Sequence, residues 1–103
     1  MTLREVLDDA AALAGADGSL AVDVDAAGAI SWSSGGTEFA NVDATGLTAA
    51  FRLDTVLAGA ARRTPDVGSS SRGADWVEFR PPVLDGHATD RATAWFLAAL
   101  RRA

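Results

Sequence analysis

The chain has 103 residues, of which 49% are hydrophobic and 22% charged, and its formal net charge at pH 7 is −5. This length fits a single domain around one core, so we treat residues 1–103 as one domain. The absence of cysteine excludes disulfides, thiolate catalysis and cysteine-bound zinc, and the acidic balance argues against general binding to nucleic acid or anionic membranes.

The composition also bears on the compartment and the source. No apolar run approaches the roughly 18 to 20 residues that a membrane helix needs. Charged residues interrupt positions 1–15, so no signal-peptide core forms there, and we expect a cytoplasmic protein. Lysine, glutamine and tyrosine are absent and alanine is abundant, which indicates a bacterial genome rich in G and C.

Residues 3–14 are predicted to form a helix. Thr2 and Glu5 have the spacing of a capping box, in which each side chain satisfies a free backbone amide of the first turn. Apolar residues then recur at helical spacing, namely Leu3, Val6, Leu7, Ala10, Leu13 and Ala14. Gly15 and the Asp17-Gly18 pair are expected to end the helix.

Four short strands are predicted next, because apolar residues alternate with polar or small ones between turn-forming residues. They are expected at 20–24, 29–33, 37–42 and 47–53, joined by turns at 25–28, 35–36 and 43–46. Such closely spaced strands favour an antiparallel meander.

The remainder is predicted as helix, loop, strand and helix. Asp54 is placed to cap a helix that Pro65 ends, and residues 66–74 have the composition of an irregular loop. A fifth strand is expected at 76–79 and a final helix at 88–102, capped by Asp85 or Thr89. The predicted fold is therefore α+β, in the order α-β-β-β-β-α-β-α, with about five antiparallel strands and three helices on one face, a two-layer sandwich. The predicted core comprises Leu7, Val22, Phe39, Phe51, Leu57, Val77, Phe79 and Phe96.

This order and a few short motifs resemble known bacterial families. The motifs are Gly36-Thr37-Glu38-Phe39, then Leu47 with Phe51, then Trp76-Val77-x-Phe79 before a closing helix. Over about residues 30–102 they resemble a small bacterial family called the luciferase domain, whose activity is not established, and also the YjbR-like domains. The resemblance implies the helix-first meander, and YjbR-like proteins have been suggested to bind DNA. The acidity and lack of lysine depart from a DNA-binding protein.

The segment from Gly68 to Gly73 is the candidate anion site. Small residues free the backbone amides, and the guanidinium of Arg72 can bind a carboxylate or phosphate with two hydrogen bonds. The residues assigned to this site are Arg72, Ser69, Ser70, Ser71, Arg62 and Arg63. An irregular connector without a ligand is the alternative.

Trp76 is a candidate contact residue, and a residue that covers the sheet edge is the alternative. Val77 and Phe79 share one face of the predicted strand, which puts Trp76, Glu78 and Arg80 on the other face, with Trp76 partly exposed. Trp32 and Trp95 are expected in the core. The three residues Trp76, Glu78 and Arg80 form the predicted interface.

Catalytic and metal sites are not predicted. His87 is the single histidine, beside Asp85 and Asp90, but no nucleophile-elbow motif surrounds Ser69, Ser70 or Ser71, so we expect His87 to be exposed. The acidic residues lack the spacing of a calcium-binding loop, and no cofactor is expected.

The sequence leads to three hypotheses. The first is a non-catalytic binding or protein-interaction module, which can include self-association through the open sheet face. The second is a domain that binds a small anion or metabolite weakly at the Arg72 loop, and the third is a hydrolase-type enzyme. No nucleic acid and no membrane partner is expected.

Overall fold

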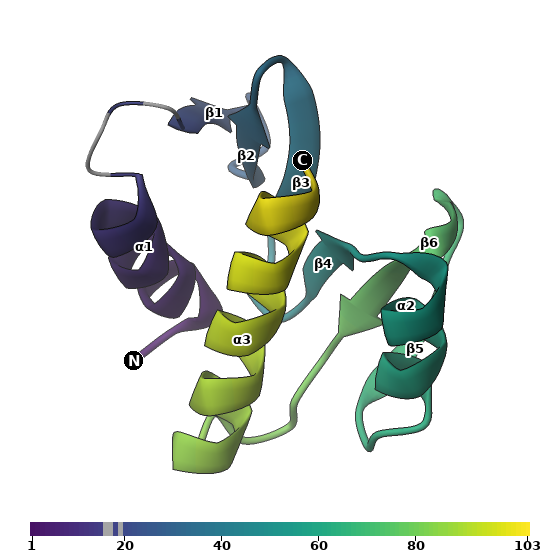
Figure 1. Cartoon of the computed structure of the whole chain (residues 1–103). Coiled ribbons are helices and arrows are strands. Elements are labelled where there is room, and N and C mark those ends of the chain that lie inside the picture. Colours follow the sequence, from purple (N-terminus) through teal and green to yellow (C-terminus); the bar gives the residue numbers. More distant parts are fainter. Residues whose placement is uncertain (16–17, 19) are drawn as a thin grey trace.

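The computed structural model describes residues 1–15, 18 and 20–103, and these form three helices and one six-stranded antiparallel sheet. The elements are α1 (Leu3–Ala14), β1 (Leu20–Val24), β2 (Ile30–Ser34), β3 (Thr37–Val42), β4 (Ala49–Arg52), α2 (Thr55–Arg62), β5 (Val67–Ser70), β6 (Gly73–Phe79) and α3 (Gly86–Arg102). The strand order is β1-β2-β3-β4-β6-β5, and the helices lie on one side of the sheet (Figure 1). The α+β class and the two-layer arrangement are confirmed.

Helix ends follow the predicted caps. The Thr2 hydroxyl accepts a hydrogen bond from the Glu5 amide at 3.2 Å, and the Glu5 carboxylate accepts one from the Thr2 amide at 3.1 Å. Asp85, rather than Thr89, caps α3 by accepting from the Ala88 amide at 2.8 Å. Gly15 caps the end of α1, and Asp17, also expected at that end, lies outside the described residues.

Two rows of side chains run across the sheet on the helix side and form most of the core. Strand register aligns Val24, Ile30, Val42, Ala49, Phe79 and Val67 in one row, and Val22, Trp32, Ala40, Phe51, Val77 and Ser69 in the next. Because side chains alternate along a strand, these rows share one face. The central members are buried, and exposure increases at the two edges.

Helix α3 presents two adjacent aromatic residues to different halves of the sheet. Phe96 packs edge-on against Trp32 and Phe39, with ring centroids 5.5 and 5.2 Å away. Trp95 packs against Phe79 at 5.1 Å and Phe51 at 6.2 Å. Helix α3 therefore packs against both halves of the sheet, β2–β3 through Phe96 and β4–β6 through Trp95.

An ion cluster fixes the C-terminal end of α3. Arg102 Nη1 and Arg52 Nε both donate to Asp75 Oδ2, at 3.1 and 3.2 Å. The hydrogen bond from Arg102 is the main reason that the pKa of Asp75 lies below its ordinary value, and Arg52 adds to it.

Residues 66–74 contradict the predicted loop. They include β5, the turn at Ser71-Arg72 and the start of β6, so the sheet has six strands rather than about five. The prediction was wrong because backbone hydrogen bonds to β6 stabilise this edge strand, and these do not depend on the side chains. Of the residues of β5, only Val67 packs against the core. The glycine and serine residues of β5 therefore have the composition of a loop although they form a paired strand.

Two predicted core residues are less buried than expected. Val22 is 54% exposed and Leu57 is half-buried, whereas the other six predicted residues are buried. Val22 faces the helix side, but β1 packs closely only against β2 among the described elements. The alternating pattern identified its face correctly and could not show that this end of the sheet lacks a covering helix.

Candidate functional site

The sheet face opposite the helices is the main candidate surface. Register places Asp23, Ser31, Asn41, Ala50, Glu78 and Gly68 in one row across this face. The row is mostly polar, in contrast to the apolar rows on the helix side. We call this surface the open face, since no helix among the described residues packs on it.

Trp76 lies on the open face beneath the side chain of Arg72. The Arg72 Cζ atom is 4.6 Å from the centroid of the tryptophan ring, a cation–π arrangement. Trp76 is only 7% exposed, so the prediction of a partly exposed tryptophan was wrong. Arginine covers the ring because the turn between β5 and β6, which the sequence did not predict, directs Arg72 back over its own hairpin.

Glu38 connects this hairpin to the centre of the sheet. Arg72 Nη1 donates to Glu38 Oε2 at 2.7 Å, and Asn41 Nδ2 donates to the same oxygen at 2.9 Å. Arg72 and Glu38 are 34 positions apart in the sequence, so the pair is visible only once the sheet order is known. Sequence reasoning missed Glu38 and Asn41. The signal that could have identified Glu38 and Asn41 is their polar character within a strand whose centre is mostly apolar.

A hollow of about 320 Å³ adjoins this network on the open face. Its lining combines strand and turn residues, namely Asp23, Asp25, Ala29, Ile30, Ser31, Glu38, Asn41, Asp43 and Arg72. Four carboxylates and one guanidinium thus line the hollow, and the guanidinium already pairs with Glu38. The field in the hollow is negative and favours a cationic group. We call it the acidic hollow.

Asp43 contributes an anchored charge to the acidic hollow. Partial burial raises its pKa, but hydrogen bonds from the Thr45 hydroxyl and from the backbone amides of Thr48, Leu47 and Gly46 outweigh that effect. The net result is a pKa below the ordinary value, so the carboxylate stays ionised at neutral pH.

The predicted interface residues lie along β6 and its end. Glu78 is half-buried on the open face, and Arg80 is exposed. Arg80 Nε donates to the hydroxyl of the buried Thr48 at 2.7 Å. Glu78 and Arg80 line a second hollow of about 290 Å³, beside β5. The open face therefore has an acidic region near β1–β3 and a mixed region near β5.

The residues predicted to bind an anion do not form one cluster of free donors. Arg72 is paired with Glu38, and Arg62 Nη1 donates to the backbone oxygens of Ala74 and Trp76 at 3.2 and 3.4 Å. Ser70 Oγ accepts from the Arg72 amide at 3.2 Å, and Ser69 of β5 pairs with Val77 of β6. Arg63 is the exposed C-cap of α2. An anion at Ser71-Arg72 would have to displace Glu38.

The residues considered for a hydrolase site do not form a catalytic group either. His87 is exposed in the first turn of α3, and the carboxylate of Asp85 accepts from a backbone amide. Within the described part of the chain, no side-chain hydrogen bond links His87 to a serine or to Asp85, and no three His, Asp or Glu side chains are grouped to hold a metal ion.

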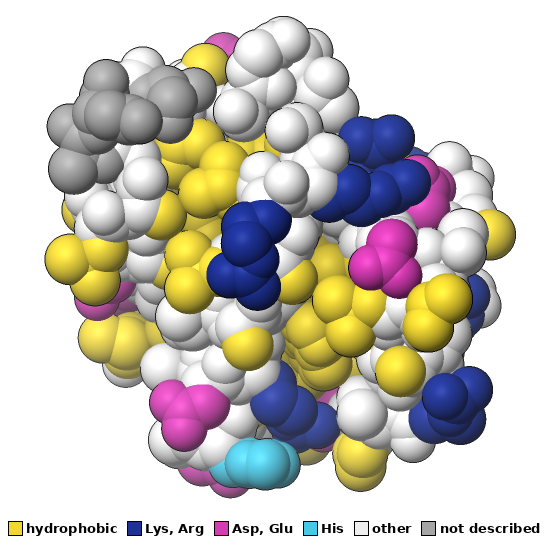
Figure 2. Space-filling view, in the orientation of Figure 1, with side chains coloured by type: hydrophobic (Ala, Val, Ile, Leu, Met, Phe, Trp, Pro, Cys, Tyr) yellow, Lys and Arg dark blue, Asp and Glu magenta, His cyan; other side chains and the backbone are white. Residues whose placement is uncertain are grey.

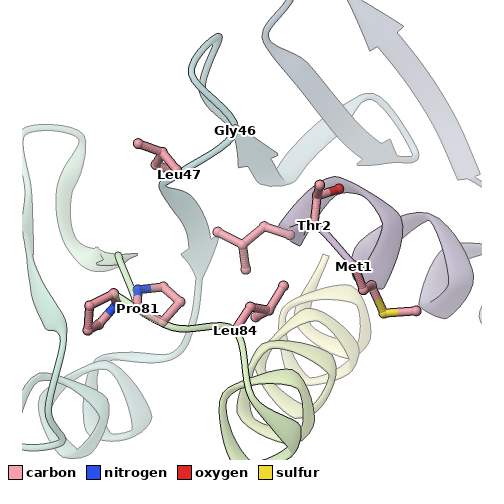
Figure 3. A pocket seen from close by; sticks show the side chains of 8 residues that line it. Met1, Thr2, Gly46, Leu47, Pro81 and Leu84 are labelled. Atoms are coloured by element: carbon pink, nitrogen blue, oxygen red, sulfur yellow. The ribbon is translucent and has the colours of Figure 1, made fainter.

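A smaller, apolar pocket of about 190 Å³ lies elsewhere, between the start of α1, the turn before β4 and the segment before α3 (Figure 3). Its lining comprises Met1, Thr2, Leu3, Gly46, Leu47, Pro81, Pro82 and Leu84. None of these described residues has an ionisable side chain. The side chains that line the pocket can accept an apolar group but supply no acid or base.

No protein-family model, curated protein or solved structure matches this chain. Among the described residues, no helix is both long enough and apolar enough to span a membrane. The interpretation of the open face therefore rests on its own geometry and charge.

Proposed function

We propose that this protein is a non-catalytic interaction module whose open face binds a basic segment of a partner protein. The observation that carries the proposal is the acidic hollow, which lies on a sheet face without a helix above it in the described chain. The strands of the open face are held by ladder hydrogen bonds, so a bound extended segment would need little reorganisation of the protein.

Charge selects the kind of partner. Asp23, Asp25, Glu38 and Asp43 line the hollow, and the sequence as a whole has an excess of negative charge. Two copies meeting through the open face would place like charges opposite each other, which disfavours that form of self-association. A segment with spaced arginine or lysine side chains would instead meet complementary charge.

The Arg72–Trp76 pair provides a second point of contact. Stacking holds the guanidinium over the ring, and the ion pair with Glu38 fixes it at the border of the acidic hollow. An incoming cationic group can compete with Arg72 for Glu38. We therefore expect partner binding to change the environment and fluorescence of Trp76, whereas Trp32 and Trp95 stay within the core.

A peptide titration tests the proposal. We would measure fluorescence anisotropy of a labelled peptide of alternating arginine and valine, beside a peptide with glutamate in place of arginine. The basic peptide should bind, and its affinity should fall as salt rises from about 50 to about 200 mM. The glutamate peptide should not bind.

Matched variants locate the binding surface. Asp23→Asn with Asp25→Asn removes two charges from the hollow while keeping an acceptor oxygen at the turn, and should weaken binding roughly tenfold. Asp9→Asn with Asp90→Asn changes the net charge equally on exposed helix positions and should have a much smaller effect. Equal losses in both variants, or no binding of the basic peptide, would refute the proposal.

A further inference from the structure

We propose that β1 is an open sheet edge through which two copies of this chain pair, forming one continuous antiparallel sheet. This inference concerns the edge of the sheet and does not depend on the proposed function of the open face. It starts from the direction of the backbone groups of β1.

The β1–β2 turn fixes which backbone groups point outward. The Asp25 amide donates to the Ala29 carbonyl at 2.9 Å, and the Gly28 amide donates to the Asp25 carbonyl at 3.1 Å. Hydrogen-bonded and non-hydrogen-bonded pairs alternate along an antiparallel ladder. With the observed register, Ala21 and Asp23 therefore direct their backbone groups toward β2.

The intervening residues Leu20, Val22 and Val24 direct their N–H and C=O groups to the free edge. The same three residues place apolar side chains on the helix side, where Val22 is 54% and Val24 50% exposed. Hydrophobic side chains remain visible on that side of the molecule (Figure 2). Among the described residues, backbone groups without a partner and exposed apolar side chains thus coincide on one strand.

The other edge of the sheet is protected in ways that β1 is not. β5 has four residues, contains Gly68 and has a register irregularity between Ser69 and Ser70. β1 has five residues, no proline or glycine, and continuous register with β2. Bulges hinder edge-to-edge pairing, and β1 has none, while its one charged side chain, Asp23, lies on the open face. Pairing of β1 with β5 of another copy is accordingly disfavoured, and with it an open-ended fibre.

A second copy fits β1 by symmetry. An antiparallel pairing centred on Val22 puts Val22 opposite itself, Leu20 opposite the second copy's Val24, and Ala21 opposite its Asp23. Every outward backbone group then has a partner, the apolar side chains form one stripe, and the Asp23 carboxylates do not face each other directly.

The expected dimer is weak. Five residues span only about 17 Å, so the contact is smaller than the roughly 1,200 to 2,000 Å² of stable interfaces. We expect a dissociation constant in the micromolar range. Because Asp23 and Asp25 are brought nearer to their copies, added salt should strengthen the dimer. Binding of a basic peptide at the open face should show the opposite salt dependence, so the two proposals can fail separately.

Sedimentation velocity from about 1 to about 500 µM tests the pairing. The wild-type mass should rise from one to two copies over this range. Val22→Lys and Val22→Glu each place like charges opposite each other in the dimer. Each variant should therefore raise the dissociation constant of the dimer at least about tenfold. An equimolar mixture of the two variants places opposite charges together and should recover the dimer.

Val83→Lys is the matched control, since Val83 is 67% exposed and lies outside β1. It should dimerise like the wild type, and circular dichroism should show that all variants are folded. A wild type that stays monomeric at the highest concentration would overturn the proposal. So would V22K dimers as stable as those of the wild type, or a mixture of variants that fails to associate.

Discussion

Replacing Phe96 with Ala is the sharpest test of the core. Phe96 is fully buried and packs edge-on against two rings, Trp32 and Phe39. Phe→Ala changes in cores cost about 3 to 5 kcal/mol, and each aromatic pair contributes about 0.5 to 1.5 kcal/mol beyond area burial. With two such pairs lost, we expect a decrease of about 4 to 5 kcal/mol in the free energy of unfolding.

Urea denaturation followed by circular dichroism and tryptophan fluorescence measures this loss. Because typical domains have about 5 to 15 kcal/mol of stability, Phe96→Ala can leave too little folded protein to fit. Phe96→Leu keeps a large apolar side chain but loses both aromatic pairs, so it should cost about 1 to 3 kcal/mol and keeps the test measurable. Leu13→Ala, at an 86% exposed position of α1, should stay within about 0.5 kcal/mol of the wild type. A loss below about 1 kcal/mol for Phe96→Ala, at unchanged denaturant slope, would refute the described packing of α3.

Three further outcomes are expected. The pKa of Asp43 is lower in the folded state than when unfolded, so its ionised form stabilises the fold above about pH 4, and this contribution is lost as pH falls through the folded pKa. Unfolding measured against pH should show a shallower acid loss in Asp43→Ala than in the wild type, and parallel curves would contradict this. Asp85→Ala removes the α3 cap and should cost about 1 kcal/mol in urea denaturation, whereas His87→Ala in the first turn of the same helix should change stability by no more than about 0.5 kcal/mol. Labelled duplex DNA at about 150 mM salt should give no binding signal, since residues 1–51 carry eight acidic residues against one arginine and repel it. Micromolar affinity there would favour the DNA-binding function suggested for YjbR-like domains.

Local signals in the sequence were sufficient for most of the fold. The capping box at Thr2 and Glu5 and the apolar spacing after it located α1, and the alternation around Val77 and Phe79 identified the buried face of β6. These features depend on residues close in sequence, which is why periodicity detects them. The predicted α+β class followed from their order.

Features that depend on distant residues were missed. β5 is ordered by pairing with β6, so its glycine and serine residues gave no strand signal. Trp76 is buried because Arg72 turns back over it and binds Glu38, a contact that no local pattern specifies. Val22 has the alternation of a core residue, yet it is 54% exposed because, among the described elements, its strand packs closely only against β2.

The contact between α1 and α3 has a consequence for folding during synthesis. Among the described elements α1 is translated first, and its main packing partner, α3, is translated last. At roughly 5 to 20 residues per second, the ribosome needs about 4 to 14 s to make the chain between them. Throughout that interval the apolar stripe of α1 has no helix to pack against, and contacts so far apart in sequence form slowly. A nascent chain arrested before residue 86 should therefore be far more sensitive to protease in α1 than one released after residue 102.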